Sequence, residues 1–265
     1  MVDPTVDYPK AVQLATYCQD IYQDFSTLMF PGQAEEPLLI STSPSEAIDA
    51  MNTDTQCAVL PNGAAATIVF RGSESSYDWE INFDTAQERA EFDQKIIQDV
   101  IVEEAAREQR YPYKGRNRSE SLIHRGFTAA YFSVRDQLHD YITGRRITAV
   151  TVTGHSLGGA LATLCAVDLQ YNFPNLTRLE IYTFGAPRVG NSGFSDAYNE
   201  RVPRSYRFVN GMDIVPALPR WWQGRYAHVA QEVRIGQRIK LRFLRSRFKD
   251  HGIAEYLEAL TLLAA

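Results

Sequence analysis

Apolar residues recur along this chain with two different periods, separated by polar stretches. Short runs rich in Val, Ile, Thr and Tyr are typical of buried strands. Elsewhere apolar residues return every three or four positions, which predicts helices that bury one face. The predicted helices cover residues 9–30, 85–110, 126–142, 156–172, 192–201 and 251–265; a hairpin covers 55–72, and further strands cover 147–154, 178–185, 204–211, 225–235 and 238–245.

Strands and helices alternate from residue 147 to residue 211, with short connections between them. This order predicts right-handed strand–helix–strand units and a parallel sheet. We therefore expect an α/β fold with a central, mostly parallel sheet flanked by helices. The chain has no internal repeat and no Gly/Ser-rich linker, so residues 1–265 are expected to form one domain.

Composition narrows the class of protein. The 265 residues carry a net charge of -5, which gives no general attraction to nucleic acid. The three cysteines are far apart and suggest no disulfide framework, and neither a signal peptide nor a membrane-spanning run is evident. These features favour a cytoplasmic rather than a secreted protein. The carboxylates do not cluster at calcium-loop spacing, so we expect no metal and no required cofactor.

The segment Gly154-His155-Ser156-Leu157-Gly158 lies between a predicted strand and a predicted helix. A G-x-S-x-G motif in that context predicts a nucleophilic serine on a sharp turn, with its hydroxyl raised above the sheet. The backbone N–H of Leu157 would then face a developing oxyanion at the helix start. The alternative is a plain helix-capping serine, which does not explain the flanking glycines.

A base and an acid must accompany the nucleophile, and in α/β-hydrolases they follow it along the chain. His251 stands before the terminal helix, where a loop can bring it over Ser156, whereas His228 is predicted within a strand and favours a structural role. Asp213 follows a strand parallel to the one before Ser156, so both would emerge at the carboxyl edge of the sheet. Asp213 could instead be a turn residue, with Asp250 and Asp196 as alternative acids.

The segment VTVTGHSLGGALATL resembles the nucleophile segment of the class 3 lipases, the family of fungal triacylglycerol lipases with the α/β-hydrolase fold. The resemblance covers about residues 55–260 and continues, in the expected order, through IVFRGSES, IHRGF, YTFGAPRVGN, NGMDIVPALP, YAHVAQEV and DHGIAEYL. It implies a triad of Ser156, Asp213 and His251, and an oxyanion hole formed by Leu157 and Ser73. Ser73 could otherwise be an ordinary turn serine. His155 is expected to orient the nucleophile or to contact substrate.

The family also carries a lid after the segment that contains Ser73. Here a long, charged insertion follows, and we expect residues 73–121 to form a helical lid or cap with Trp79 lining the acyl pocket. The apolar stripe of the predicted helix would face the active-site mouth. It could instead pack on the flank of the domain, because an amphipathic stripe requires only some apolar partner.

These features predict a serine ester hydrolase, a lipase or carboxylesterase acting on acylglycerol or other fatty-acyl esters. A phospholipase A1 or a feruloyl-type esterase is the alternative, and a non-catalytic lipase-like signalling protein is the alternative of another class. The expected partners are the ester substrate and, transiently, a lipid surface. The basic residues of the strand over 238–245 could contact that surface. Their alternation with apolar residues instead favours an antiparallel strand with one solvated face. The oligomeric state is not predicted.

Overall fold

The computed structural model describes residues 3–42, 55–73, 87–88, 121–219, 225–236 and 249–265. Trp79 and the basic strand over 238–245 lie outside these residues. Of the predicted lid, only its two ends, Ser73 and residue 121, and the internal residues 87–88 are described. Within the described part, no helix has the length and apolar character needed to cross a membrane.

A seven-stranded sheet forms the centre of the molecule, in the order β1-β2-β3-β6-β7-β9-β11. The strands from β3 onward run parallel to one another, and β1, β2 and β3 form an antiparallel meander at one edge. The expected mostly parallel sheet is therefore confirmed. Its strands are β1 (Leu38–Ser41), β2 (Gln56–Asn62), β3 (Ala65–Phe70), β6 (Ala149–His155), β7 (Arg178–Phe184), β9 (Ser205–Asn210) and β11 (Gln231–Ile235).

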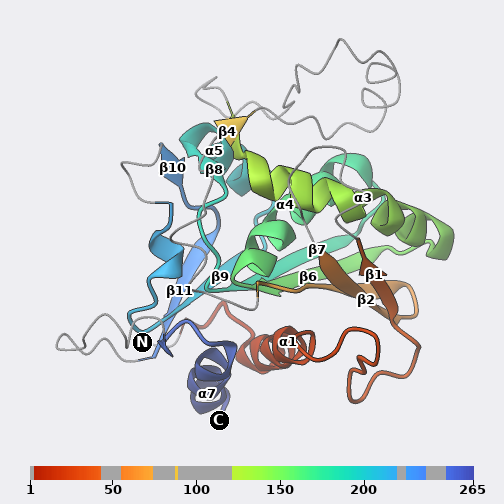
Figure 1. Ribbon diagram of the computed structural model, residues 1–265, viewed down its shortest axis with the longest axis horizontal. Coiled ribbons are helices and arrows are strands. Elements are labelled where there is room, and N and C mark those ends of the chain that lie inside the picture. The colour runs from red at the N-terminus through yellow and green to blue at the C-terminus, as the bar shows by residue number, and fades with distance from the viewer. Residues whose placement is uncertain (1–2, 43–54, 74–86, 89–120, 220–224, 237–248) are drawn as a thin grey trace.

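Helices cover both faces of this sheet (Figure 1). On one face α3 (Arg125–Arg145), α4 (Leu157–Asn172) and α5 (Ser192–Arg201) enclose one apolar core. On the other, α1 (Tyr8–Asp20) and α7 (Ile253–Ala264) pack together over a second core. The two ends of the chain thus meet beneath the sheet, which brings residues near position 20 close to residues near position 255.

A small antiparallel sheet lies beside the main one. It consists of two-residue strands in the order β10-β8-β5-β4. These are β4 (Gln87–Glu88), β5 (Ile123–His124), β8 (Gly190–Asn191) and β10 (Tyr226–Ala227). The prediction of helix at residues 87–88 is wrong, because they pair in extended conformation with β5; the rest of that helix lies outside the described residues.

Two further elements differ from the sequence prediction. The strand predicted over 225–235 is divided between β10 and β11, which belong to different sheets, and Ala230 between them has a positive φ of 66° that no regular strand contains. The first helix ends at Asp20 rather than continuing to residue 30. Beyond it, the carboxylate of Asp24 accepts from the backbone N–H of Ser26 at 3.0 Å, in a local turn that competes with the helix.

Candidate active site

Ser156 occupies a sharp turn between β6 and α4. Its φ of 57° and ψ of -125° are strained for a residue with a side chain, and its N–H donates to the carbonyl of Phe184 at 2.9 Å. The flanking glycines make this turn possible. A Cβ on Gly154 would lie under 3.0 Å from the backbone of Gly158, and one on Gly158 under 3.0 Å from the carbonyl of Phe70. The motif therefore carries glycine where strand and helix approach most closely.

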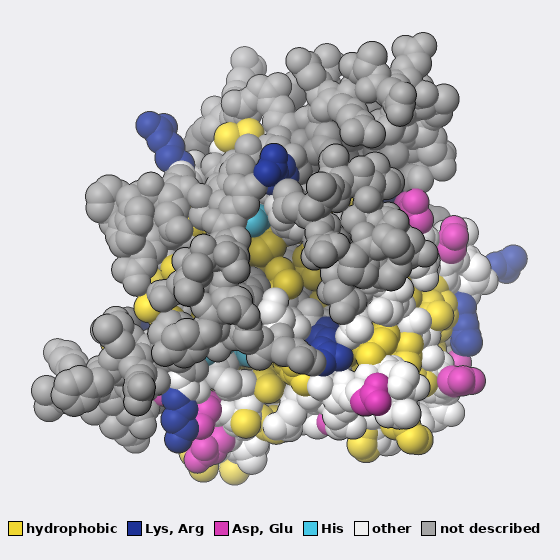
Figure 2. Space-filling model, in the orientation of Figure 1, with side chains coloured by type: hydrophobic (Ala, Val, Ile, Leu, Met, Phe, Trp, Pro, Cys, Tyr) yellow, Lys and Arg dark blue, Asp and Glu magenta, His cyan; other side chains and the backbone are white. Residues whose placement is uncertain are grey.

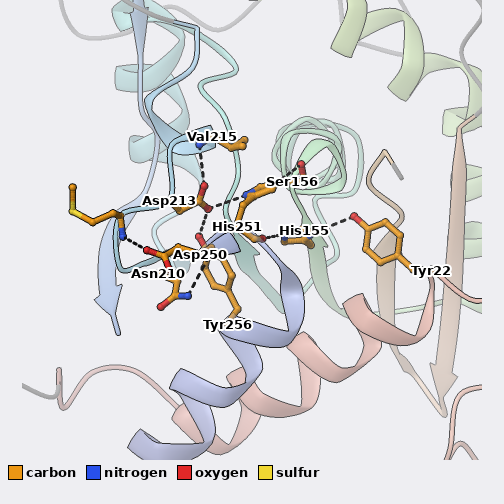
Figure 3. A network of polar contacts seen from close by, with 10 residues as sticks. Tyr22, His155, Ser156, Asn210, Asp213, Val215, Asp250, His251 and Tyr256 are labelled. Atoms are coloured by element: carbon orange, nitrogen blue, oxygen red, sulfur yellow. Dashed lines mark hydrogen bonds and ion pairs between the residues drawn. The ribbon is translucent and has the colours of Figure 1, made fainter. Parts of the chain in front are cut away.

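The hydroxyl of Ser156 does not cap α4. Instead, its Oγ lies 2.9 Å from Nε2 of His251 (Figure 3). The strained backbone thus presents the hydroxyl to an imidazole rather than to the helix, unlike an ordinary capping serine.

His251 lies in the short segment before α7, with only 3% of its surface exposed. Its Nδ1 is 2.9 Å from Oδ2 of Asp213. Since a carboxylate only accepts hydrogen bonds, we assign the proton of the neutral ring to Nδ1, which leaves Nε2 free to accept from Ser156. This is the arrangement needed for His251 to remove the serine proton.

Asp213 follows β9, so its side chain emerges at the same carboxyl edge of the sheet as Ser156. Its Oδ1 accepts from the backbone N–H of Val215 at 2.9 Å, and its Oδ2 accepts from both His251 and the hydroxyl of Tyr256, the latter at 2.6 Å. The carboxylate is thus fixed from three sides. The two alternative acids are elsewhere: Asp250 accepts from the N–H of Met212 at 3.0 Å and so braces the turn before Asp213, and Asp196 lies in α5.

Tyr256 was not singled out in the sequence, although it touches the proposed acid. It lies on α7, fully buried, and burial together with the charge of Asp213 raises the pKa of its hydroxyl well above the ordinary value. It therefore remains a proton donor to the carboxylate. The available signal was weak: an aromatic residue on the apolar face of a helix, five positions after His251.

Gly185 leaves room for this pair of side chains. It follows β7 with a φ of +63°, and a Cβ here would lie 2.9 Å from both Asp213 Oδ2 and His251 Nδ1. A side chain at this position would displace either Asp213 or His251.

A cavity of about 320 Å³ opens beside the turn that carries Ser156. Ser73 and Leu157, the two residues expected to form the oxyanion hole, both line it, together with Thr55, Gln56, Arg71, Gly72 and Leu161. The last pair in the register of β3 and β6 joins Phe70 to Gly154, so the segment that carries Ser73 leaves the sheet next to Ser156. Figure 2 shows hydrophobic side chains at the bottom of a hollow on this side of the molecule.

Two other histidines, His155 and His228, form hydrogen bonds with other parts of the protein. Nε2 of His155 donates to the carbonyl of His251 and Nδ1 contacts the hydroxyl of Tyr22, so both ring nitrogens are engaged behind the base rather than in the cavity. Nε2 of His228 donates to the carbonyl of Pro216, in the 3₁₀ helix η2 (Val215–Ala217) that follows Asp213. This contact suits the structural role expected for His228, although the residue lies between two strands rather than within one.

No group of three or more His, Cys, Asp and Glu side chains among the described residues could hold a metal ion. The reactive groups brought together are a hydroxyl, an imidazole and a carboxylate in hydrogen-bonded series. Such a series can perform nucleophilic substitution at a carbonyl carbon without a metal.

Comparison with known proteins identifies several lipases. The chain is 36% identical over 115 residues to a secreted mono- and diacylglycerol lipase of Fusarium solani, a match covering 42% of this chain and 33% of that protein. It is 33% identical over 111 residues to a chloroplastic phospholipase A(1), DAD1, of Arabidopsis thaliana, covering 38% and 25%. The matches thus span only a quarter to a third of these relatives' lengths.

The fold is shared with a solved triacylglycerol lipase whose catalytic centre is formed by a serine protease triad. The TM-score is 0.65 with 26% sequence identity, over 89% of this chain and 82% of the other. Because the similarity covers 89% of this chain, it supports the α/β-hydrolase fold for nearly all of it.

The expectation of a cytoplasmic protein is wrong. The relatives include the secreted Fusarium enzyme, which points to secretion instead. The three cysteines are free and buried within apolar cores. A domain of this size buries enough apolar surface to fold without disulfides, so their absence among these cysteines is no argument for a reducing compartment.

A model of the family described as "Lipase (class 3)" matches residues 67–222, more than half of the chain. The match includes the segment of Ser73, the turn of Ser156 and the predicted acid Asp213. The chain therefore belongs to the class 3 lipase family.

Proposed function

We propose that the protein is a serine ester hydrolase, a lipase or carboxylesterase that cleaves acylglycerols or other fatty-acyl esters. The observation that carries the proposal is the continuous series from Ser156 through His251 to Asp213, with both contacts at 2.9 Å. Ser156, His251 and Asp213 act as nucleophile, general base and orienting acid.

The reaction follows from this geometry. Nε2 of His251 takes the proton as Oγ of Ser156 attacks the ester carbonyl, and Asp213 stabilises the imidazolium that forms. The backbone N–H groups of Leu157 and Ser73 hold the oxyanion, a single donor of this kind being worth ~10²–10³ in rate. His251 then protonates the departing alcohol, leaving an acyl-serine, and water repeats the cycle to release the acid.

The proposal defines the substrate less narrowly than it defines the reaction. Leu157 and Leu161 supply an apolar wall to the cavity, and Gln56 and Arg71 a polar one, which suits an ester with an apolar acyl group and a polar alcohol. The Fusarium relative supports acylglycerols, and the Arabidopsis relative supports phospholipase A1 activity as the second candidate. Hydrophobic pockets separate acyl chains weakly, so activity across several chain lengths is expected.

The domain organisation remains part of the proposal. We infer one domain over residues 1–265, in which residues 73–121 form a lid that meets a lipid surface transiently. The support for the lid is its position after Ser73 and the charged, amphipathic sequence. A lid that gates the cavity would make hydrolysis of emulsified substrate faster than hydrolysis of the same substrate below its solubility limit.

The test compares Ser156→Ala with wild type. A fluorophosphonate probe should label the wild type at Ser156 alone, and the variant should lose both labelling and hydrolysis, by a factor of order 10⁶ in kcat. Ser205→Ala is the matched control, since Ser205 has the same 4% exposure but lies at the start of β9 and contacts the hydroxyl of Tyr198. An active Ser156→Ala variant, or labelling at another serine, refutes the proposal.

Assays of the wild-type protein determine the class of substrate. Monoacyl-, diacyl- and triacylglycerols and a diacyl phospholipid are assayed in parallel with acyl chains from acetyl to long-chain. Faster release of fatty acid from acylglycerols than from phospholipid favours the lipase assignment, and the opposite order favours phospholipase A1.

A further inference from the structure

A second series of contacts reaches the active site from behind. His155 ends β6, is only 6% exposed and donates from Nε2 to the backbone carbonyl of His251 at 2.6 Å. On its other side, Nδ1 lies 3.0 Å from the hydroxyl of Tyr22 (Figure 3). Because a carbonyl only accepts, the proton of His155 is on Nε2, so Nδ1 accepts and Tyr22 donates.

The charge state of His155 is fixed by the same surroundings. Burial, with the nearby His251 as the second cause, holds the pKa of His155 well below its ordinary value. Its ring centroid is 4.6 Å from that of His251, and the other rings beside it belong to Tyr22 and Tyr256. A neutral His155 adds no repulsion when His251 becomes positively charged.

Tyr22 itself is fixed by the segment that carries the proposed oxyanion donor. A guanidinium N–H of Arg71 donates to the Tyr22 carbonyl at 3.3 Å, and the guanidinium lies 5.8 Å from the centre of the Tyr22 ring. A Cβ on Gly72 would lie under 3.0 Å from both the Tyr22 hydroxyl and the His155 carbonyl. Glycine at position 72 thus allows the hydroxyl to reach His155, one residue before Ser73.

We propose that Tyr22 is a positioning residue for catalysis. Through His155 it fixes the backbone of His251 against Ser156, and through its contacts with Arg71 and Gly72 it couples this base to the segment of Ser73. Neither Tyr22 nor His251 lies within the 67–222 match to the family model. The inference rests on the proposed ester hydrolysis, and it assigns to the N-terminal segment a part in the geometry of the reaction.

Tyr22→Phe removes the hydroxyl and keeps the ring. We expect kcat to fall about tenfold with KM unchanged, because one hydrogen bond that holds the base is lost while the cavity keeps its lining. Rates are expressed per active site titrated with fluorophosphonate, so that a smaller folded fraction does not count as slower chemistry. Tyr17→Phe is the matched control: Tyr17 is 7% exposed on α1, its hydroxyl accepts from Gln13 and Gln33, and its loss should leave kcat unchanged.

A second pair of variants covers the case in which Tyr22→Phe does not fold. His155→Gln keeps an amide N–H for the His251 carbonyl and should retain most of kcat, whereas His155→Leu, which offers none, should lose at least as much as Tyr22→Phe. In the double variant Tyr22→Phe/His155→Leu the losses should not add, because both residues act through one series of bonds.

The outcomes separate the two proposals. A wild type that does not react with the probe refutes the proposed function itself. A reactive wild type with unchanged kcat in Tyr22→Phe, or with a raised KM alone, refutes only the positioning role. Equal kcat values for His155→Gln and His155→Leu also refute only the positioning role.

Discussion

His228 should make the protein less stable in mild acid. Burial, followed by the positive charge of Arg207, lowers the pKa of His228 to about 3 in the folded protein. In the unfolded chain the pKa is about 6.5. As the pH falls below 6.5 the unfolded state therefore binds a proton that the folded state does not, and the free energy of unfolding decreases until about pH 3.

The loss of free energy of unfolding at pH 5 depends only on how far His228 is protonated in the unfolded state, because His228 remains neutral in the folded protein at that pH. Protonation of the unfolded imidazole lowers the free energy of unfolding by about 2 kcal/mol between pH 8 and pH 5. Burial also holds the pKa of His155 below its ordinary value, so this residue changes the stability in the same direction. Carboxylates with lowered pKa, such as Glu180 and Glu232, lose their contribution mainly below pH 4.5, so they leave this interval largely to the histidines.

The assay is urea-induced unfolding of wild type and His228→Gln at pH 8 and pH 5. The glutamine amide can still donate to the Pro216 carbonyl but does not titrate, so the variant should lose about 2 kcal/mol less than wild type between the two pH values. Ser195→Ala is the control, because it removes the hydroxyl that donates to the His228 carbonyl at 2.5 Å and should destabilise equally at both pH values. An identical pH dependence in wild type and His228→Gln refutes the reasoning.

The sheet and the turn at Ser156 could be predicted because they follow from local patterns. Continuous apolar runs and one sharp glycine-rich turn determined the strands, the helix and the hydroxyl between them. His251 and Asp213 were then found from chain order and from the common edge at which parallel strands end. Their catalytic roles remain proposals, and the structure adds that a single hydrogen-bonded series joins them to Ser156.

Tyr22 and Tyr256 could not be predicted in the same way. Each reaches the site from a helix-bearing end of the chain, and these ends meet only because α1 and α7 pack together beneath the sheet. The contacts of these two tyrosines depend on packing between segments far apart in the chain, and such packing leaves no period in the sequence. The division of the strand at Ala230 has a similar origin, since it depends on the backbone conformation of one residue that propensity does not specify.

Two substitutions, each with a matched control, test how the backbone and the hydrogen bonds of the site support its geometry. Gly158→Ala should fold, but its rate of ester hydrolysis should fall at least a hundredfold. The new Cβ would lie under 3.0 Å from the carbonyl at the end of β3 and would displace the turn that carries Ser156. Gly144→Ala, which has open space around it, should keep full activity in the same ester assay. Tyr256→Phe removes a buried donor at 2.6 Å from the carboxylate of Asp213 and should lower the free energy of unfolding by about 1.5–3 kcal/mol in urea. Tyr198→Phe is equally buried but loses only a neutral serine partner at 2.8 Å, so it should cost about 1 kcal/mol. The two hydroxyls differ chiefly in the charge of the group they contact. Equal losses in free energy of unfolding would therefore show that the negative charge of Asp213 adds nothing to the hydrogen bond from Tyr256. Such a result would refute the role of Tyr256 in stabilising a charged Asp213.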